Sequence, residues 1–226
     1  METERHHRIK KIIIAIIIIP IALFLALLII SFVANVFQRS QQIKQTQNPA
    51  YSGSDKTLIE GQNMQSFGAA NPQLTIVEFA DFACPFCKAS FPAIRQTAIE
   101  HQDKIKVIFR DWPGHQYSVA LANGAYCAGE QEKFWEMHDK LYQHQSDTFG
   151  SSKNDLAGLA SELGIYNEQF RSCFDTQKYL PLIQKNFADS QTLQVRGTPT
   201  WFFNGKKVEG ALTSDDLAKV IDAYLK

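Results

Sequence analysis

"LTIVEFADFACPFCKAS", residues 74–90, decides the fold, because it joins an apolar run to a helical pattern through two closely spaced cysteines. Residues 74–80 are nearly continuous in apolar character, as buried parallel strands are. Beyond the cysteines, apolar side chains recur at helical spacing from Phe91 to Ile99,. A second apolar run follows at residues 105–112. The pattern predicts a strand–helix–strand unit with a C-x-x-C motif at the start of its helix.

The C-x-x-C motif, Cys84 to Cys87, fits a metal site, a structural staple or a redox dithiol. Zinc needs a second pair of ligands at short spacing, but Cys127 and Cys173 are far apart and no histidine stands near either at ligand spacing. A disulfide within the motif would close so short a loop that it would stabilise the fold little. These arguments favour redox chemistry, and we expect no metal or other cofactor.

The position of the motif predicts different roles for its two cysteines. Free N–H groups and the positive end of the helix dipole stabilise a thiolate at a helix start. Cys84 is therefore the predicted nucleophile and Cys87 the resolving thiol, while Pro85 fits the first helical turn. Glu78 is either a carboxylate at a solvent-facing strand edge or, if it is buried behind the motif, a proton relay to Cys87.

The N-terminal part of the chain carries the pattern of a membrane span. Residues 12–37 are almost wholly apolar, and as a helix with about 1.5 Å per residue they exceed the roughly 30 Å hydrocarbon core of a bilayer. Basic side chains are concentrated in residues 1–11, which predicts a cytoplasmic tail and export of the remainder. We expect a retained signal-anchor, with a cleaved signal peptide as the alternative.

A flexible linker, residues 38–57, and one exported domain, residues 58–226, are predicted to follow the span. All four cysteines lie in that domain, where an even count indicates disulfides,. A bridge between Cys127 and Cys173 would close a long loop worth about 4 kcal/mol on the chain-entropy model. We therefore assign these two cysteines to a structural disulfide, provided that their helices meet.

The second half of the domain combines a helical region with a hairpin. Residues 115–192 show helical apolar spacing in several stretches,. Residues 200–203 and 206–209 read as two strands joined by an Asn-Gly turn, and a capped amphipathic helix follows,. Acidic and basic residues balance at 23 each, which leaves no electrostatic footprint for nucleic acid.

At this point the chain resembles the membrane-anchored bacterial branch of the DsbA-like thioredoxin-fold oxidoreductases. The resemblance rests on the ordered set VEF (77–79), CPFC (84–87), CAGE (127–130) with FW (134–135), and GTPTWFFNGKKVEGA (197–211). It implies a thioredoxin fold with an inserted helical domain at about residues 115–192. It also implies that Thr198 and Pro199 form a cis-proline loop that binds an extended substrate, beside Pro85 and Phe86. Without the resemblance, a trans bond would be the expectation.

The function implied is a membrane-tethered protein thiol:disulfide oxidoreductase, acting as a monomer on exported proteins. Its expected location is the bacterial cytoplasmic membrane, with the domain facing the periplasm or the cell exterior. Disulfide introduction would require a membrane redox partner such as a quinone-linked reoxidant. Phe86 stands where strongly oxidising relatives carry histidine, so a reductase or isomerase fed by a membrane electron donor stays open. A peptide-binding chaperone module without enzyme activity is the alternative from another class.

Overall fold

The structure is a computed structural model that describes residues 53–145 and 153–225, together with Ser31. Two compact units divide the chain, Met1–Gln47 and Asn48–Lys226, and the second contains the fold. The predicted tail, the span except Ser31, and linker residues 38–52 lie outside the described residues. In the part of the chain that is described, none of the helices has the length and apolar character needed to cross a membrane.

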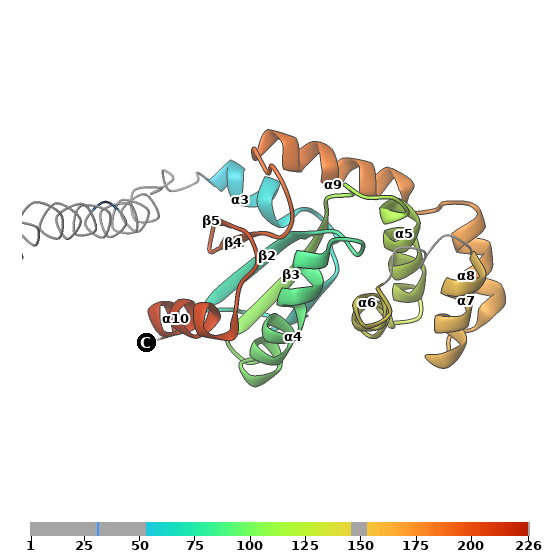
Figure 1. Cartoon of the computed structure of the whole chain (residues 1–226), viewed down its shortest axis with the longest axis horizontal. Coiled ribbons are helices and arrows are strands. Elements are labelled where there is room, and N and C mark those ends of the chain that lie inside the picture. Colours follow the sequence, from blue (N-terminus) through green and yellow to red (C-terminus); the bar gives the residue numbers. More distant parts are fainter. Residues whose placement is uncertain (1–30, 32–52, 146–152, 226) are drawn as a thin grey trace, which may run out of the picture. The chain divides into compact units, whose positions relative to one another are not determined.

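A five-stranded mixed sheet forms the centre of the second unit (Figure 1). In spatial order the strands are β1 (Ser66–Gly68), β3 (Ile105–Asp111), β2 (Leu74–Ala80), β4 (Thr200–Phe203) and β5 (Lys206–Glu209). The central pair β2–β3 is parallel, and the other neighbouring pairs are antiparallel. The two apolar runs predicted as buried strands are therefore the two strands at the centre of the sheet.

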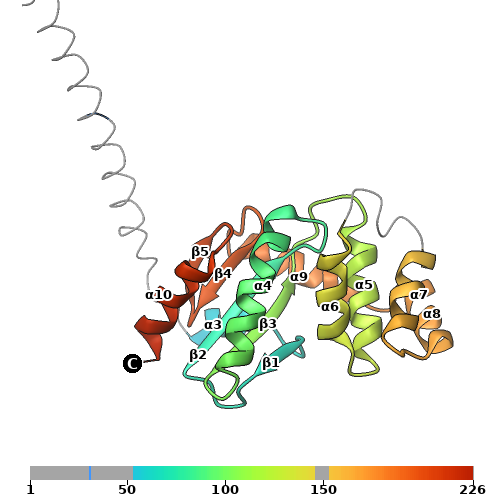
Figure 2. The ribbon, with the colours of Figure 1, turned by 60° about the horizontal axis from the view of Figure 1, so that its bottom comes forward.

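Helices cover both faces of the sheet (Figures 1 and 2). On one face lie α4 (Pro85–Glu100) and α10 (Ser214–Tyr224), which pack with side chains such as Ile76 and Trp201. On the other lie α3 (Gly53–Glu60) and α9 (Leu180–Thr192), near Val77 and Phe202. Because successive side chains of a strand point to opposite faces, neighbours in β2 contribute to two separate cores.

An inserted group of helices connects β3 to β4. Its members are α5 (Ser118–Gly129), α6 (Phe134–Gln143), α7 (Lys153–Glu162) and α8 (Asn167–Asp175), and α9 leads back to the sheet. Figure 2 shows α5 to α8 standing beside the sheet rather than over it. An aromatic cluster that includes Phe82, Phe109 and Phe134 joins them to the sheet and to α4. The predicted α/β fold with a helical insertion is confirmed.

The C-terminal hairpin has the turn that its sequence predicts. Asn204 and Gly205 both have positive φ angles, 46° and 85°, as an Asn-Gly turn of type I′ requires. The Asn204 side chain also accepts a hydrogen bond from the Thr75 backbone N–H at 2.8 Å, which fastens the turn to β2. Thr213 and Asp216 form a capping box at the start of α10,.

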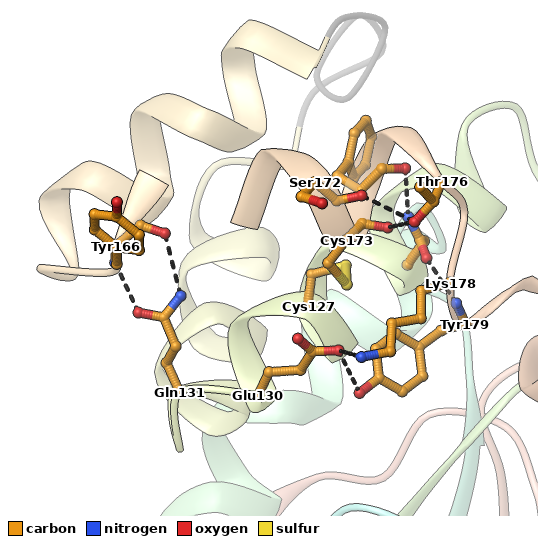
Figure 3. The surroundings of a disulfide bond; sticks show 11 residues. Cys127, Glu130, Gln131, Tyr166, Ser172, Cys173, Thr176, Lys178 and Tyr179 are labelled. Atoms are coloured by element: carbon orange, nitrogen blue, oxygen red, sulfur yellow. Dashed lines mark hydrogen bonds and ion pairs between the residues drawn. A yellow bond between two sulfur atoms is a disulfide. The ribbon is translucent and has the colours of Figure 1, made fainter. Parts of the chain in front are cut away.

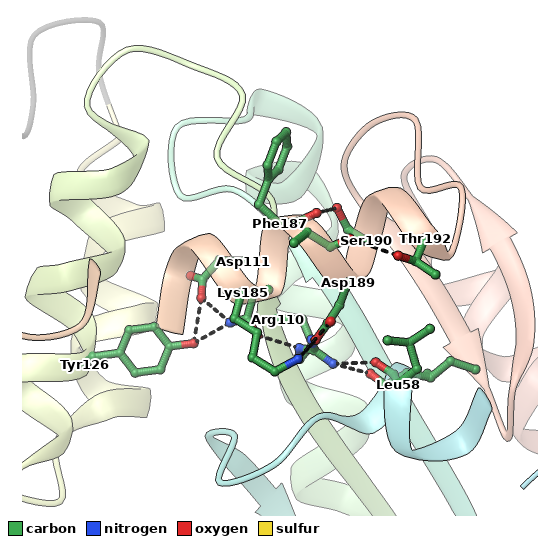
Figure 4. Close-up of polar contacts among 12 residues, drawn as sticks. Leu58, Arg110, Asp111, Tyr126, Lys185, Phe187, Asp189, Ser190 and Thr192 are labelled. Atoms are coloured by element: carbon green, nitrogen blue, oxygen red, sulfur yellow. Dashed lines mark hydrogen bonds and ion pairs between the residues drawn. The ribbon is translucent and has the colours of Figure 1, made fainter. Parts of the chain in front are cut away.

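The predicted linker was too long, because residues 53–57 belong to α3. Contacts just beyond them hold this helix: Arg110 donates hydrogen bonds to the backbone oxygens of Leu58 and Ile59 at 2.9 and 2.8 Å. Figure 4 shows the same guanidinium group reaching α9, where it pairs with Asp189 at 2.6 Å. The linker sequence has no periodic pattern that predicts this helix. The contacts that hold the helix come from the buried side chain of Arg110, 52 residues beyond Leu58.

Candidate active site

The strand register sets Glu78 under the dithiol. Glu78 pairs with Phe109 of β3 on one side and with Trp201 of β4 on the other. Register partners point to the same face, so the carboxyl group lies on the face that α4 covers, among apolar side chains. Only 1% of Glu78 is exposed. The solvent-facing alternative for this residue is therefore wrong, and the buried position is the one observed.

Cys84 and Cys87 stand where β2 passes into α4. Cys84 is the N-cap residue, Pro85 opens the helix, and the Cys84 carbonyl accepts the first helical hydrogen bond from Lys88. Both cysteines are free thiols and both are buried. The Cys84 Sγ lies 3.3 Å from the backbone oxygen of Thr198, to which its protonated form donates a hydrogen bond, so the loop before β4 contacts the first cysteine.

The pKa values of the two thiols are shifted in opposite directions. Hydrogen bonds from the Cys87 thiol, from the Thr198 side chain and from backbone N–H groups lower the pKa of Cys84 to about 5, although burial opposes them. Burial raises the pKa of Cys87 well above its ordinary value, and the hydrogen bond to Cys84 and the charges of Glu78 and Cys84 add to this effect. The helix start thus stabilises a Cys84 thiolate beside a Cys87 thiol without a histidine at position 86.

Glu78 has the acidity of a proton carrier at neutral pH. Burial raises the pKa of its carboxyl group to about 8, and the negative charge of the Cys84 thiolate is the second cause. One carboxyl oxygen, Oε1, has no hydrogen-bond partner among the described residues. A carboxyl group with such a pKa exchanges its proton readily near pH 7, which is the property that a relay to Cys87 needs.

Asp81 organises the turn before the dithiol, and sequence reasoning missed it. Its backbone oxygen accepts from Cys84 N–H at 3.0 Å and its Oδ1 from Ala83 N–H at 2.9 Å. Its Oδ2 accepts from the Ser118 hydroxyl and contacts His115 Nδ1, both at 2.8 Å. An aspartate directly after a strand signals such a turn, but the contact with the β3–α5 loop follows only from the fold.

The residues predicted to touch substrate lie around the dithiol and differ in exposure: Thr198 is half-buried and Pro199 is buried. The Thr198–Pro199 peptide bond is cis. Pro85 and Phe86 are both exposed, and Phe86, at 62%, is among the most exposed large apolar side chains of the described residues. Structure therefore brings Cys84, Thr198 and the Pro85–Phe86 pair together at one end of the sheet, with Glu78 and Cys87 beneath them.

The second cysteine pair lies apart from the dithiol, within the inserted helices. Cys127 of α5 and Cys173 of α8 form a disulfide across a sequence separation of 46 (Figure 3). The carboxylate of Glu130, one turn beyond Cys127, contacts Lys178 and Tyr179 on the chain that follows α8. The bridge and this polar cluster hold the two helices together, and they leave neither sulfur available as a metal ligand.

Comparison with known proteins relates most of the described domain to one family. Residues 61–223 match the thioredoxin family. The disulfide-exchange protein alpha-DsbA2 from Wolbachia pipientis is similar in fold, with a TM-score of 0.67 at 24% identity over 75% of this chain and 91% of that one. Oxidised BdbD from Bacillus subtilis has a TM-score of 0.62 at 25% identity, covering 72% and 92% of the two chains.

Curated relatives are much longer proteins. The Na(+)/H(+) antiporter NhaA 1 of Salinispora arenicola is 31% identical over 157 residues, which make up 68% of this chain and 24% of the relative. Other antiporters of the same name, including one from Salinispora tropica, match to a similar extent. The chain therefore spans about a quarter of these proteins, and the likeness concerns that portion alone.

Proposed function

We propose that the chain, which belongs to the thioredoxin family and has the DsbA-like fold, is a protein thiol:disulfide oxidoreductase that introduces disulfides into exported proteins. The observation that supports oxidation of the substrate, and not its reduction, is the difference in pKa between Cys84 and Cys87. A stable thiolate on the attacking cysteine stabilises the reduced dithiol and makes the disulfide more oxidising. Hydrogen bonds at the helix start supply the stabilisation that a histidine at position 86 would otherwise give.

The reaction proceeds through a mixed disulfide on Cys84. A substrate thiolate attacks Cys84 Sγ of the oxidised dithiol, the Cys84–Cys87 bond breaks, and Cys87 leaves as a thiolate that takes the proton of Glu78. A second substrate thiolate then attacks the substrate sulfur of the mixed disulfide, which forms the substrate disulfide and releases the Cys84 thiolate. Two electrons pass from the substrate to the dithiol, and an oxidising partner must remove them before the next cycle.

Substrate binding is proposed at the loop that contacts Cys84. An extended peptide that adds beside Thr198 and Pro199 would gain main-chain hydrogen bonds irrespective of its sequence. The exposed Pro85 and Phe86 offer it an apolar contact at the dithiol. Such recognition suits an enzyme that accepts many unfolded chains with free cysteines, and it needs no cofactor.

We also propose that residues 12–37 anchor the enzyme in the bacterial cytoplasmic membrane, with the domain outside the cytoplasm. The apolar run and the basic residues before it support this arrangement,. Tethering would raise the effective concentration of the dithiol near a membrane partner that reoxidises it. The enzyme is proposed to act as a monomer, since the dithiol and its proton carrier lie within one domain.

The test is the accumulation of mixed disulfides by the Cys87→Ser variant. Without a resolving thiol, adducts with exported proteins should collect on Cys84 and disappear on reduction, whereas the matched Cys84→Ser variant should form none. Adducts that collect on Cys87 instead would refute the assigned order of attack. A chaperone module without enzyme activity would keep its function when both cysteines are replaced.

The reduction potential decides between the oxidase and the alternative reductase or isomerase. A potential near the roughly −120 mV of a strong oxidant supports the proposed direction, and one near the roughly −270 mV of thioredoxin supports the reductase. Phe86→His is the matched variant: it should shift the potential only modestly, because the helix start already holds the Cys84 thiolate.

A further inference from the structure

A narrow void lies between the sheet, α4 and α6, and Glu78 is one of its lining residues. Glu78, Arg95, Trp135 and His138 are among the residues that line it. As packed, the space is too narrow to hold a water molecule. The void therefore brings the proton carrier of the dithiol close to side chains of two helices that the proposed reaction does not otherwise use.

Each of these four side chains has a buried polar atom without a hydrogen-bond partner in the described part of the chain. The atoms are Glu78 Oε1, Arg95 Nη1, Trp135 Nε1 and His138 Nε2. Buried polar atoms in folded proteins are nearly always paired, because leaving one unpaired costs about 1–3 kcal/mol. Half of the eight such atoms among the described residues belong to side chains that line this one void, so buried polar groups without a partner are concentrated there.

The hydrogen bonds of His138 determine which atom can accept a proton. His138 Nδ1 lies 2.8 Å from Asp139 Oδ1. A carboxylate only accepts hydrogen bonds, so Nδ1 carries the hydrogen, and the neutral ring presents the bare lone pair of Nε2 to the void. Burial lowers the pKa of His138, and the nearby Arg95 charge also lowers it, against the opposing effect of Asp139. The ring is therefore neutral, with Nε2 free as a base.

Asp139 connects this ring to solvent. Its side chain is 28% exposed, and Arg95 Nε donates to both of its oxygens at 3.1 Å. The Arg95 guanidinium lies over the rings of Phe67 and Trp135, 4.7 and 5.3 Å from their centres. The ion pair is thus held in place at the outer end of a path that begins at Glu78.

We propose that His138 and Asp139 form a proton path that connects Glu78 to solvent during turnover. This inference rests on the proposed function and assigns His138 as a proton-accepting residue of the same site. The titratable and charged groups around it are Glu78 on β2, Arg95 on α4, and Asp139 and Tyr142 on α6. Because the void as packed is too narrow for water, the step that closes the gap between the carboxyl group and Nε2 is a rotation of the Glu78 side chain.

The path first returns a proton from solvent to Glu78 after Glu78 has protonated Cys87, and it is needed again when the reduced dithiol is reoxidised. The Cys84 thiolate attacks a disulfide, expels the first partner thiolate and forms a mixed disulfide, and it thereby loses the negative charge that adds to burial in keeping Glu78 protonated. Glu78 then gives its proton to His138 Nε2, and the imidazolium releases a proton through Nδ1 to Asp139 and solvent. The Glu78 carboxylate next takes the proton of Cys87, and the Cys87 thiolate attacks Cys84 Sγ to form the dithiol disulfide and expel the partner thiolate.

The experiment separates the two thiol reactions in time. Reduced full-length protein, purified in detergent, is mixed with a symmetrical aromatic disulfide whose thiolate is coloured. The first thiolate is released when Cys84 attacks, and the second when Cys87 resolves the mixed disulfide. His138→Gln should leave the first phase unchanged and slow the second at neutral pH by roughly tenfold or more, below the about 10²–10⁴ of full general acid–base catalysis.

Asp139→Asn is the second variant, since it lies nearer the surface and preserves the fold if His138→Gln does not. It should also slow the second phase alone, and high pH should restore the rate in both variants. His101→Gln, the same replacement at the end of α4, is the control and should behave as the wild type. A normal second phase in both test variants would overturn the proton path, and so would an equal slowing of both phases.

Failure of the proposed function gives a different result. If wild type and Cys87→Ser release thiolate with the same single phase, then Cys87 does not resolve and the dithiol function itself is wrong. If the wild type shows two phases and Glu78→Gln slows the second while His138→Gln does not, the dithiol function stands and the path through His138 is refuted.

Discussion

Lowering the pH should remove the Cys84 thiolate and with it part of the oxidising power that the dithiol has in excess of a dithiol with ordinary pKa values. With the pKa of Cys84 at about 5 instead of its ordinary value of 9.0, the thiolate stabilises the reduced form at pH 7 by about 3 kcal/mol. For a two-electron couple that energy corresponds to about 60 mV. The site should therefore be about 60 mV more oxidising than one whose first cysteine has an unshifted pKa.

The sign of the pH dependence follows from the direction of the shift. A lowered pKa stabilises the reduced form fully above pH 9, and that stabilisation is lost as the pH falls through 5,. Between these values reduction takes up one proton, at Cys87, and the potential should change by about 30 mV per pH unit. Below pH 5 both sulfurs take up protons, so the slope should double to about 59 mV.

The assay equilibrates the protein with glutathione buffers across this pH range and counts free thiols by alkylation and mass. It is best done in the Glu78→Gln variant, because Glu78, with a pKa of about 8, would otherwise add its own proton. Thiolate absorbance gives an independent titration, with Cys84→Ser as the blank. A slope of about 59 mV throughout, or a thiolate midpoint above pH 7, would show that Cys84 is an ordinary thiol and refute the reasoning.

Three further predictions concern stability, measured by urea unfolding. Replacing Cys127 and Cys173 by serine should lower the free energy of unfolding by about 4 kcal/mol in an oxidising buffer on the chain-entropy model, and by clearly less under reducing conditions, where only the burial of the serine hydroxyls counts; equal losses in both would contradict the assignment of a structural bridge. Arg110→Met should lower the free energy of unfolding by roughly 3–5 kcal/mol, because it leaves the buried Asp189 without its cationic partner,. Lys185→Met removes the exposed cation that pairs with the same aspartate and should cost much less. Similar losses in the two variants would argue against the buried network. Thr213→Ala should cost about 1 kcal/mol through the lost capping box, and an unchanged midpoint would show that α10 does not need it.

Local patterns predicted the elements that position the dithiol. The strands β2 and β3, the start of α4, the hairpin turn at Asn204 and the cap at Thr213 all follow from periodicity and turn chemistry over a few residues. The turn and the caps form between residues that are close in sequence, and the apolar runs are buried as inner strands of the sheet. The two roles within the C-x-x-C motif also follow from the helix start alone.

Features that depend on distant contacts could not be predicted in this way. The three-residue strand β1 has too few residues for a pattern, and α3 depends on hydrogen bonds from Arg110. The sequence left open whether the Glu78 carboxyl group is buried, because this depends on which strands lie on either side of β2. Asp81, His115 and His138 acquire their partners from loops and helices elsewhere in the chain, and a lone histidine in a helix gives no signal of its own.

The strand register described for β2 has a consequence for how the protein tolerates insertions and deletions. Adding or removing one residue within the strand would turn the carboxyl group of Glu78 from the side of Cys87 to the side of Arg110 and α9, and would leave an acid among the wrong neighbours. Helices α7 and α8, by contrast, pack mainly against other inserted helices and can change in length without moving Glu78. The spacing of six residues between Glu78 and Cys84 therefore has to be kept, and we expect natural insertions and deletions to avoid this stretch.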